Sequence, residues 1–171
     1  LKALLADQDV PGDLTLLGYS MGGSVITAFA AAQPERIKHL ILLAPAGIDF
    51  NETSSARLAR TFPIFGDWWM EVVVRHTMTK ALMGERHNRI EVGGIVDKQL
   101  DALNQRGYLR AVLSSMRGIL ADRQQDAHER LGQMGIPVTA IWGEADNIIP
   151  SSGAETLSKW NLDAKQEIIS G

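Results

Sequence analysis

A serine between two glycines is the residue whose surroundings point most directly to chemistry. Gly18-Tyr19-Ser20-Met21-Gly22 matches the pattern G-x-S-x-G, which presents a serine hydroxyl as a nucleophile at a sharp strand-to-helix turn. Roughly one chain in eleven of this composition would contain such a match by chance. The position is more informative than the match, because an apolar run precedes it at residues 14–17 and an alanine-rich segment follows at residues 24–32.

The neighbours of Ser20 suit a nucleophile in such a turn. Gly18 and Gly22 are expected to let the helix pack close to the strand, since side chains would crowd so tight a corner. The backbone N–H of Met21 would lie at a helix N-terminus, where it can donate to a developing oxyanion. The alternative is a glycine-rich turn in which Ser20 only caps the helix. The nucleophile hypothesis predicts a positive φ angle at Ser20.

Asp146 is the candidate acid of the same site. It follows the apolar segment 136–143 by a short loop, and sites form beyond the carboxyl ends of parallel strands. Its carboxylate would orient a histidine and stabilise the imidazolium. The hypothesis places Ser20 and Asp146 on one sheet edge, about 6–9 Å apart, which leaves room for one imidazole. A plain turn at Asp146-Asn147 is the alternative. Asp49 is a second candidate acid, although its position is more typical of a helix or turn cap.

The segments around these residues alternate between strand and helix character. Residues 14–17 and 37–43 are apolar runs typical of strands buried on both faces, and the alanine-rich segment between them ends at Pro34. Strand, helix and strand within about thirty residues indicate a parallel βαβ unit. Later in the chain the pattern predicts a strand at 136–143, a helix at 151–160 capped by Ser151 or Ser152, and a strand at about 166–169.

The middle of the chain has helical patterns and few strand signals. Amphipathic helices are predicted at about 52–62, 67–83, 95–105, 107–122 and 125–132, with glycine and proline residues between them. The sequence therefore predicts an α/β fold, a partial parallel sheet with a helical insertion. Residues 1–50 and 133–171 would form the core, and residues 51–132 the insertion.

These motifs, in this order, resemble the α/β-hydrolase superfamily with a serine nucleophile and a cap. Residues 14–48 look like its fifth strand, nucleophile elbow, following helix and sixth strand. The insertion looks like its cap domain, and residues 136–150 look like its seventh strand and acid-bearing loop. The resemblance implies a nucleophile at Ser20, an oxyanion donor at Met21, an acid at Asp146, and neither a cofactor nor a metal. It also implies a histidine after the eighth strand and a second oxyanion donor after the third.

The histidines of this sequence do not match that order. All four precede Asp146, and they are His39, His76, His87 and His128. His39 is expected on a strand face, and the others on helices of the insertion or in a loop between them. We therefore expect the sequence to be a fragment whose base lies beyond residue 171, and which alone hydrolyses esters poorly.

The same reasoning concerns the first strand. The first four strands of the family would be absent, so Leu14–Leu17 would expose an unpaired edge. We expect missing segments of the protein or a second copy, in a homo-oligomer, to cover that edge.

Composition and charge exclude several classes of protein. With 45% hydrophobic and 22% charged residues and no cysteine, the sequence is neither disordered nor a disulfide scaffold. A net charge of −3 argues against a nucleic-acid partner. No apolar run is long enough to span a bilayer, and no leader pattern opens the sequence. The lack of cysteine suits a reducing compartment, so a cytoplasmic location is expected.

The insertion is rich in aromatic and methionine residues. They are Phe62, Phe65, Trp68, Trp69, Met70, Met78 and Met83. Such an apolar surface indicates an apolar substrate, or alternatively side chains that pack the cap on the core. The sequence therefore predicts a serine hydrolase that acts on an apolar carboxylic ester or acyl compound. A thioesterase, a C–C bond hydrolase, a perhydrolase, a lyase or a non-catalytic binding relative could share the elbow.

Overall fold

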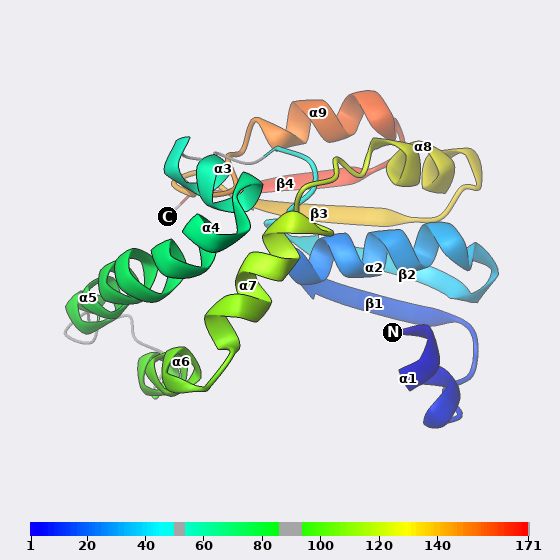
Figure 1. The fold of residues 1–171 in the computed structure, drawn as a ribbon. Coiled ribbons are helices and arrows are strands. Elements are labelled where there is room, and N and C mark those ends of the chain that lie inside the picture. Colours follow the sequence, from blue (N-terminus) through cyan, green and yellow to red (C-terminus); the bar gives the residue numbers. More distant parts are fainter. Residues whose placement is uncertain (50–53, 86–93, 171) are drawn as a thin grey trace. The chain divides into compact units, whose positions relative to one another are not determined.

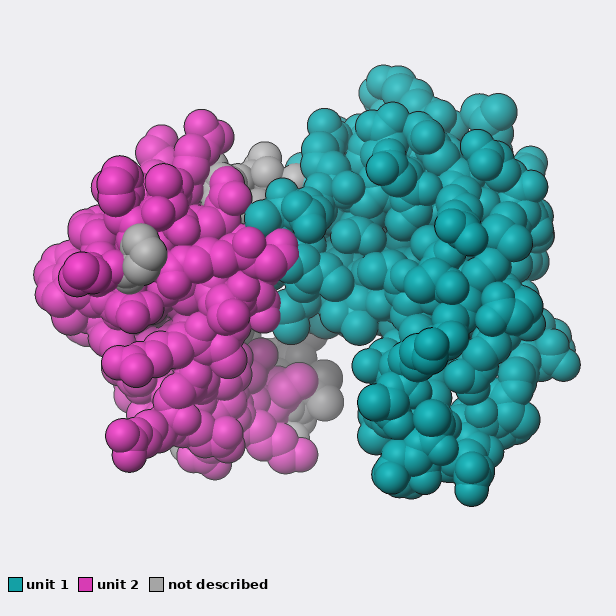
Figure 2. All heavy atoms as spheres, turned by 45° about the vertical axis from the view of Figure 1, so that its right-hand side comes forward, with its two compact units in different colours: residues 1–51, 119–171 teal, residues 52–118 magenta. Residues whose placement is uncertain are grey.

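The computed structural model describes residues 1–49, 54–85 and 94–170 of the chain. The chain divides into two compact units, which Figure 2 shows in different colours. Unit 1 consists of residues 1–51 and 119–171, and unit 2 consists of residues 52–118. His87 lies outside the described residues, so its predicted place in a loop has no structural counterpart here.

Unit 1 is built on a parallel sheet whose strand order follows the sequence. Its strands are β1 (Leu14–Tyr19), β2 (Ile37–Leu43), β3 (Val138–Gly143) and β4 (Lys165–Ile169). Neighbouring strands pair in parallel throughout. The helices of unit 1 are α1 (Lys2–Asp7), α2 (Met21–Ala32), α8 (Gln125–Gln133) and α9 (Gly153–Trp160), with a short 3-10 turn η1 (Pro34–Arg36) before β2 (Figure 1). The predicted βαβ unit is confirmed.

The core of unit 1 lies between one face of this sheet and helices α2, α8 and α9. Leu40 and Leu42 of β2 are fully buried on that face, beside Val138 and Ala140 of β3. The indole N–H of Trp142, which is also fully buried, donates to Gln166 Oε1 at 3.0 Å and joins β3 to β4. Apolar side chains at every second position of a strand reach the same face, so this core follows directly from the apolar runs.

β1 differs from its prediction as a strand buried on both faces. Its burial alternates, and the side chains of Leu17 and Tyr19 are 61% and 68% exposed. Within the described residues β1 pairs with β2 alone, so it is an edge strand. The side chains that point away from α2 lie on the sheet face opposite the core, and this explains their exposure.

Unit 2 is helical, as predicted. It contains α3 (Ser54–Thr61), α4 (Pro63–Trp69), a π-helical turn η2 (Met70–Val74), α5 (Arg75–Glu85), α6 (Ile95–Asn104) and α7 (Tyr108–Arg117). Met70, Leu103, Leu109 and Leu113 form a core of its own. Trp69 packs against this cluster, whereas Phe62, Trp68 and Met83 are more than half exposed. The apolar side chains of the insertion therefore divide into a buried set and an exposed set.

The insertion is shorter than predicted, because α8 belongs to unit 1. Leu131 of α8 is fully buried in the same core as β2 and β3, and α8 packs against α2 and α9. The predicted boundary at residue 132 is therefore corrected to residue 118. An amphipathic pattern shows that a helix has a buried face but not which core receives it.

Two helix starts also differ from prediction. α2 begins at Met21, earlier than the expected residue 24. Ser152 occupies the position before α9, but its side chain makes no capping hydrogen bond, so the predicted serine cap is wrong. Among the described helices, none has the length and apolar character that a membrane crossing requires.

Candidate active site

Ser20 lies at the corner between β1 and α2. Its backbone angles are φ 50° and ψ −120°, so the predicted positive φ is confirmed. This region is uncommon for residues other than glycine. Conformations of this kind concentrate at functional sites, where the surrounding structure holds them in place.

Three backbone hydrogen bonds hold Ser20 in this conformation. Its N–H donates to the carbonyl of Leu43 at 2.9 Å, at the end of β2. Its carbonyl accepts from the N–H of Gly23 at 2.9 Å and from the N–H of Ala46 at 3.1 Å. Both peptide groups of Ser20 are therefore fixed by neighbouring elements, and the direction of its side chain is set by the fold.

The glycines around Ser20 have unequal roles. A Cβ atom on Gly18 would lie 2.6 Å from the carbonyl oxygen of Gly22, and one on Gly23 would lie 2.9 Å from Cβ of Pro45. A Cβ on Gly22 would have no described atom within 4 Å. The prediction is thus confirmed for Gly18 and wrong for Gly22, whose backbone makes the close approach while its α-carbon faces open space. Gly23 takes the place expected of Gly22.

Met21 is the first residue of α2. The first N–H groups of a helix have no carbonyl partner within the helix, and the helix dipole favours negative charge beside them. The position of Met21 is therefore that of an oxyanion donor, and its role in catalysis stays a prediction.

Asp146 lies in the loop that follows β3, where its carboxylate is held by backbone groups. Oδ1 accepts from the N–H of Ile148 at 2.8 Å and from the N–H of Ile149 at 2.9 Å. Oδ2 has no hydrogen-bond partner among the described residues. The turn alternative thus describes what one oxygen does, while the other oxygen remains available to a further donor.

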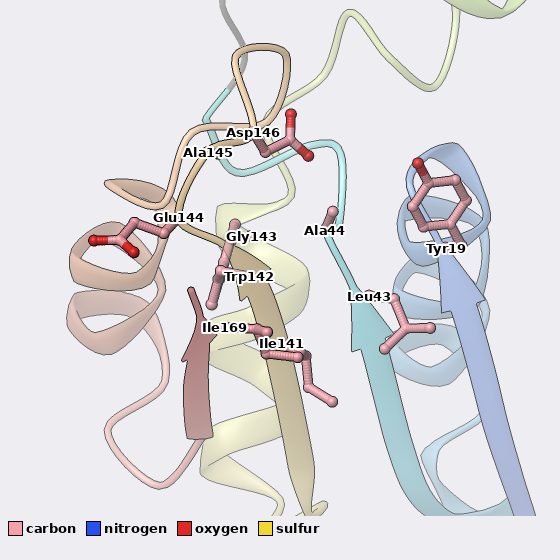
Figure 3. A pocket seen from close by; sticks show the side chains of 10 residues that line it. All are labelled: Tyr19, Leu43, Ala44, Ile141, Trp142, Gly143, Glu144, Ala145, Asp146 and Ile169. Carbon is pink, nitrogen blue, oxygen red and sulfur yellow. The ribbon is translucent and has the colours of Figure 1, made fainter. Parts of the chain in front are cut away.

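Ser20 and Asp146 follow the carboxyl ends of parallel strands, so both lie at the same edge of the sheet. A pocket of about 400 Å³ opens at this edge. In Figure 3, Asp146 lies beyond the end of β3 and Tyr19 at the end of β1, with Ala44 after β2 between them. The pocket is lined by Tyr19, Leu43, Ala44, Ile141, Trp142, Gly143, Glu144, Ala145, Asp146 and Ile169. Its lining is mostly apolar.

Tyr19 and Ala44 are pocket residues that the sequence analysis did not identify. Ala44 has φ 39°, a second positive value at the same edge. Its N–H donates to the carbonyl of Ile141 at 2.8 Å. The available signal was position alone, since Tyr19 ends β1 and Ala44 directly follows β2.

Asp49, the second candidate acid, is engaged elsewhere. Its Oδ1 forms an ion pair with Arg123 at 2.9 Å, and its Oδ2 accepts from the hydroxyl of Thr156 at 2.8 Å. Both carboxylate oxygens therefore have side-chain partners. The structure replaces the expected cap with a contact between distant parts of unit 1.

The described histidines lie away from this edge. His39, in β2, is half-buried, and its Nε2 is 2.9 Å from Thr139 Oγ1, which confirms its place on a strand face. His76 is exposed on α5. His128 is buried in α8 and stacks on Trp160, with ring centroids 6.2 Å apart. Burial lowers the pKa of His128 from 6.5 to about 4, so this imidazole is neutral at pH 7.

A family model described as "alpha/beta hydrolase fold" matches residues 11–171. The chain belongs to the α/β-hydrolase family. Monoacylglycerol lipase ABHD6 from Homo sapiens is 26% identical over 166 residues, which cover 90% of this chain and 47% of that protein. A 2-hydroxy-6-oxononadienedioate/2-hydroxy-6-oxononatrienedioate hydrolase from Cupriavidus pinatubonensis is 27% identical over 158 residues, covering 88% of this chain and 51% of that protein. The chain spans about half the length of these curated relatives.

Solved structures agree on the fold of this α/β hydrolase. A bromoperoxidase from Bacillus anthracis matches with a TM-score of 0.73 at 13% identity, covering 99% of this chain and 63% of that one. The 2-hydroxy-6-oxo-6-phenylhexa-2,4-dienoate hydrolase from Rhodococcus sp. strain RHA1 matches with a TM-score of 0.68 at 18% identity, covering 98% and 59%. At such identities the likeness concerns the fold alone.

Proposed function

We propose that this α/β hydrolase cleaves carboxylic esters, with Ser20 as nucleophile, Asp146 as acid and the N–H of Met21 as one oxyanion donor. The observation that carries the proposal is the strained corner at Ser20, held by hydrogen bonds from two sides. Asp146 follows a parallel strand at the same sheet edge. Nucleophile and acid of a hydrolase triad require this arrangement.

The mechanism starts with attack of Ser20 Oγ on the ester carbonyl carbon. A histidine accepts the hydroxyl proton, and the carbonyl oxygen becomes an oxyanion near the N–H of Met21. The protonated histidine donates its proton to the leaving alkoxide, and an acyl-enzyme remains. Water attacks the acyl carbon by the reverse proton transfers and releases the acid.

We propose that the histidine is supplied from outside these 171 residues. His39 makes its contact within the sheet, and His128 is buried against Trp160. Asp146 Oδ2 would accept from the N–H of the incoming imidazole, since Oδ1 is occupied by the loop. Without that imidazole the Ser20 hydroxyl is a weak nucleophile at neutral pH, so the 171 residues alone should turn over esters poorly.

The pocket supports an apolar ester or acyl compound as substrate. Leu43, Ile141 and Ile169 line it, and they favour apolar groups. The first-named relative is called a monoacylglycerol lipase, which is consistent with an ester that carries a hydrocarbon chain. The exposed side chains of unit 2, Phe62 and Trp68 among them, supply further apolar surface for such a substrate.

A C–C bond hydrolase is the second candidate, because one relative is named as a hydrolase of an oxo-diacid. Glu144 and Asp146 line the pocket, and their carboxylates would repel a dianionic substrate. The ester proposal is therefore preferred. Thioesters, peracid formation, a lyase reaction and a non-catalytic role are distinguished by the same assays. A cytoplasmic location is proposed only because the sequence lacks cysteine.

The test is hydrolysis of p-nitrophenyl esters by the full-length protein. Ser20→Ala should lower kcat about 10⁴-fold or more, and Asp146→Asn about 10³- to 10⁴-fold. Asp126→Asn is the matched control, because Asp126 is an exposed carboxylate on α8, and it should leave kcat unchanged. Turnover that survives Ser20→Ala would contradict the proposal.

A further inference from the structure

The two points where the chain leaves and re-enters unit 1 are joined directly to each other. The N–H of Gln124 donates to the carbonyl of Gly47 at 2.7 Å. Next to this bond, Arg123 Nη2 contacts Asp49 Oδ1 at 2.9 Å. The whole of unit 2, residues 52–118, lies between these contacts in the sequence. Its two roots are therefore fastened by one backbone bond and one ion pair.

Both partners of the ion pair have a second contact with α9. The hydroxyl of Thr156 donates to Asp49 Oδ2 at 2.8 Å, and the guanidinium of Arg123 lies 5.1 Å from the ring centroid of Trp160. An isolated exposed ion pair contributes little, because solvent screens it and two side chains lose freedom. Here both side chains are already positioned by α9, so less freedom is lost when the pair forms. We call Asp49, Arg123, Thr156 and Trp160 the root clamp.

A chain of hydrogen bonds leads from the root clamp to the nucleophile. The Ser24 hydroxyl donates to the carbonyl of Ala46 at 2.7 Å, and the N–H of Ala46 donates to the carbonyl of Ser20 at 3.1 Å. Gly47 follows with φ 87°, and a Cβ there would lie 2.6 Å from the Gln124 side chain. The segment 44–49 thus joins the Ser20 corner at one end and the root clamp at the other.

We propose that Asp49 and Arg123 are positioning residues that hold the roots of unit 2 in register with the Ser20 corner. A loosened root would let the insertion change its orientation as a body, while the sheet and the corner keep their own hydrogen bonds. Its effect on turnover rests on the proposed ester hydrolysis. The insertion would affect long substrates that reach its apolar side chains, and short esters would be handled by the pocket at the sheet edge alone.

The clamp itself is tested by amide hydrogen exchange on the full-length protein, which does not depend on any activity. Arg123→Met should speed exchange of the Gln124 amide about fivefold, a size typical of losing a well-placed ion pair. Arg130→Met is the matched control, since Arg130 is exposed on α8 and its loss changes the net charge equally. Equal exchange rates at Gln124 in both variants would overturn the clamp.

The positioning role is tested by steady-state kinetics of the same variants on two esters. Arg123→Met and Asp49→Asn should raise KM for p-nitrophenyl decanoate about fivefold, while kcat and the KM for p-nitrophenyl acetate stay within about twofold. Because they remove one shared contact, the double variant should raise KM no further than either single one. Faster exchange with an unchanged KM for the long ester would overturn the positioning role. If the unaltered protein cleaves neither ester, the ester proposal fails and the exchange result still decides the clamp.

Discussion

At the scale of single residues, the conformation of Ser20 is the feature that sequence and structure describe in the same way. Its positive φ could be predicted because a nucleophile in a strand-to-helix turn must be pushed out above the sheet. The role of Gly22 could not. The pattern G-x-S-x-G requires small residues, but only the paths of β1 and α2 decide that Gly18 meets the backbone of Gly22 while Gly22 faces open space.

Alanine substitutions should separate the three glycines. Gly18→Ala places a Cβ 2.6 Å from a backbone oxygen, and Gly23→Ala places one 2.9 Å from Pro45. Each should lower the free energy of unfolding by more than about 2 kcal/mol, because backbone atoms must move. Gly22→Ala should change it by less than about 0.5 kcal/mol, since alanine suits a helix and meets no neighbour. Urea unfolding measures all three, and a loss at Gly22 as large as at Gly18 would contradict this packing.

His128 should make stability depend on pH. Burial lowers its folded-state pKa from 6.5 to about 4, so the unfolded chain binds the proton more strongly. This contribution is fully present above pH 6.5 and is lost as pH falls from about 6.5 to about 4, amounting to about 3 kcal/mol.

Urea unfolding of the parent protein and of His128→Phe, across this pH range, isolates that contribution. Phenylalanine keeps a ring against Trp160 but binds no proton, so the variant should lose less stability as the pH falls. Carboxylates titrate alike in both proteins and cancel in the comparison. Equal pH slopes in the two proteins would show that His128 is not responsible.

At the scale of elements, strands were easier to predict than the boundaries of the insertion. The run at 37–43 is found as β2 with the same bounds, because a short apolar run between turn signals has few other uses. α8 was assigned to the insertion because its amphipathic pattern resembles that of its neighbours. The partners of Asp49 were equally hidden, since Arg123 and Thr156 are 74 and 107 positions away. Contacts at such separations leave no periodic signal.

The short distance between the roots predicts that unit 1 tolerates removal of unit 2. In the full-length protein, residues 52–118 would be replaced by a few Gly and Ser residues. Gly47 and Gln124 are hydrogen-bonded at 2.7 Å, so a short linker can close the gap at little entropic cost. The shortened protein should keep a cooperative unfolding transition and the slow exchange of β2 amides. Loss of that transition would mean that unit 1 depends on the insertion for its fold.

At the scale of the whole molecule, the open edge and open face of the sheet call for a covering element. Leu17 and Tyr19 are more than half exposed on β1, and within the described residues this strand has a neighbour on one side only. An apolar edge of this kind promotes strand addition and aggregation. The relatives are about twice as long as this chain, so we propose that further segments of the protein cover β1.

The 171-residue chain, expressed alone, should therefore self-associate. Light scattering coupled to size exclusion should show species larger than one chain, and the amides of Leu14–Leu17 should exchange faster than in the full-length protein. The matched sample is the full-length protein at the same concentration. A monodisperse monomer of the 171 residues, with protected β1 amides, would show that α2 and the insertion stabilise this edge sufficiently.

The nucleophilic role of Ser20 is tested most directly by covalent labelling of the full-length protein with a fluorophosphonate, followed by peptide mass spectrometry. Ser20 and Ser24 lie on one peptide, which makes Ser24 an internal control. The Ser24 hydroxyl is buried and donates to the Ala46 carbonyl, whereas Ser20 lies at the strained corner. Fragment ions should place one phosphonyl group on Ser20 and none on Ser24, and Ser20→Ala should abolish labelling. A protein that remains unlabelled, or that is labelled at another serine, would contradict Ser20 as the nucleophile.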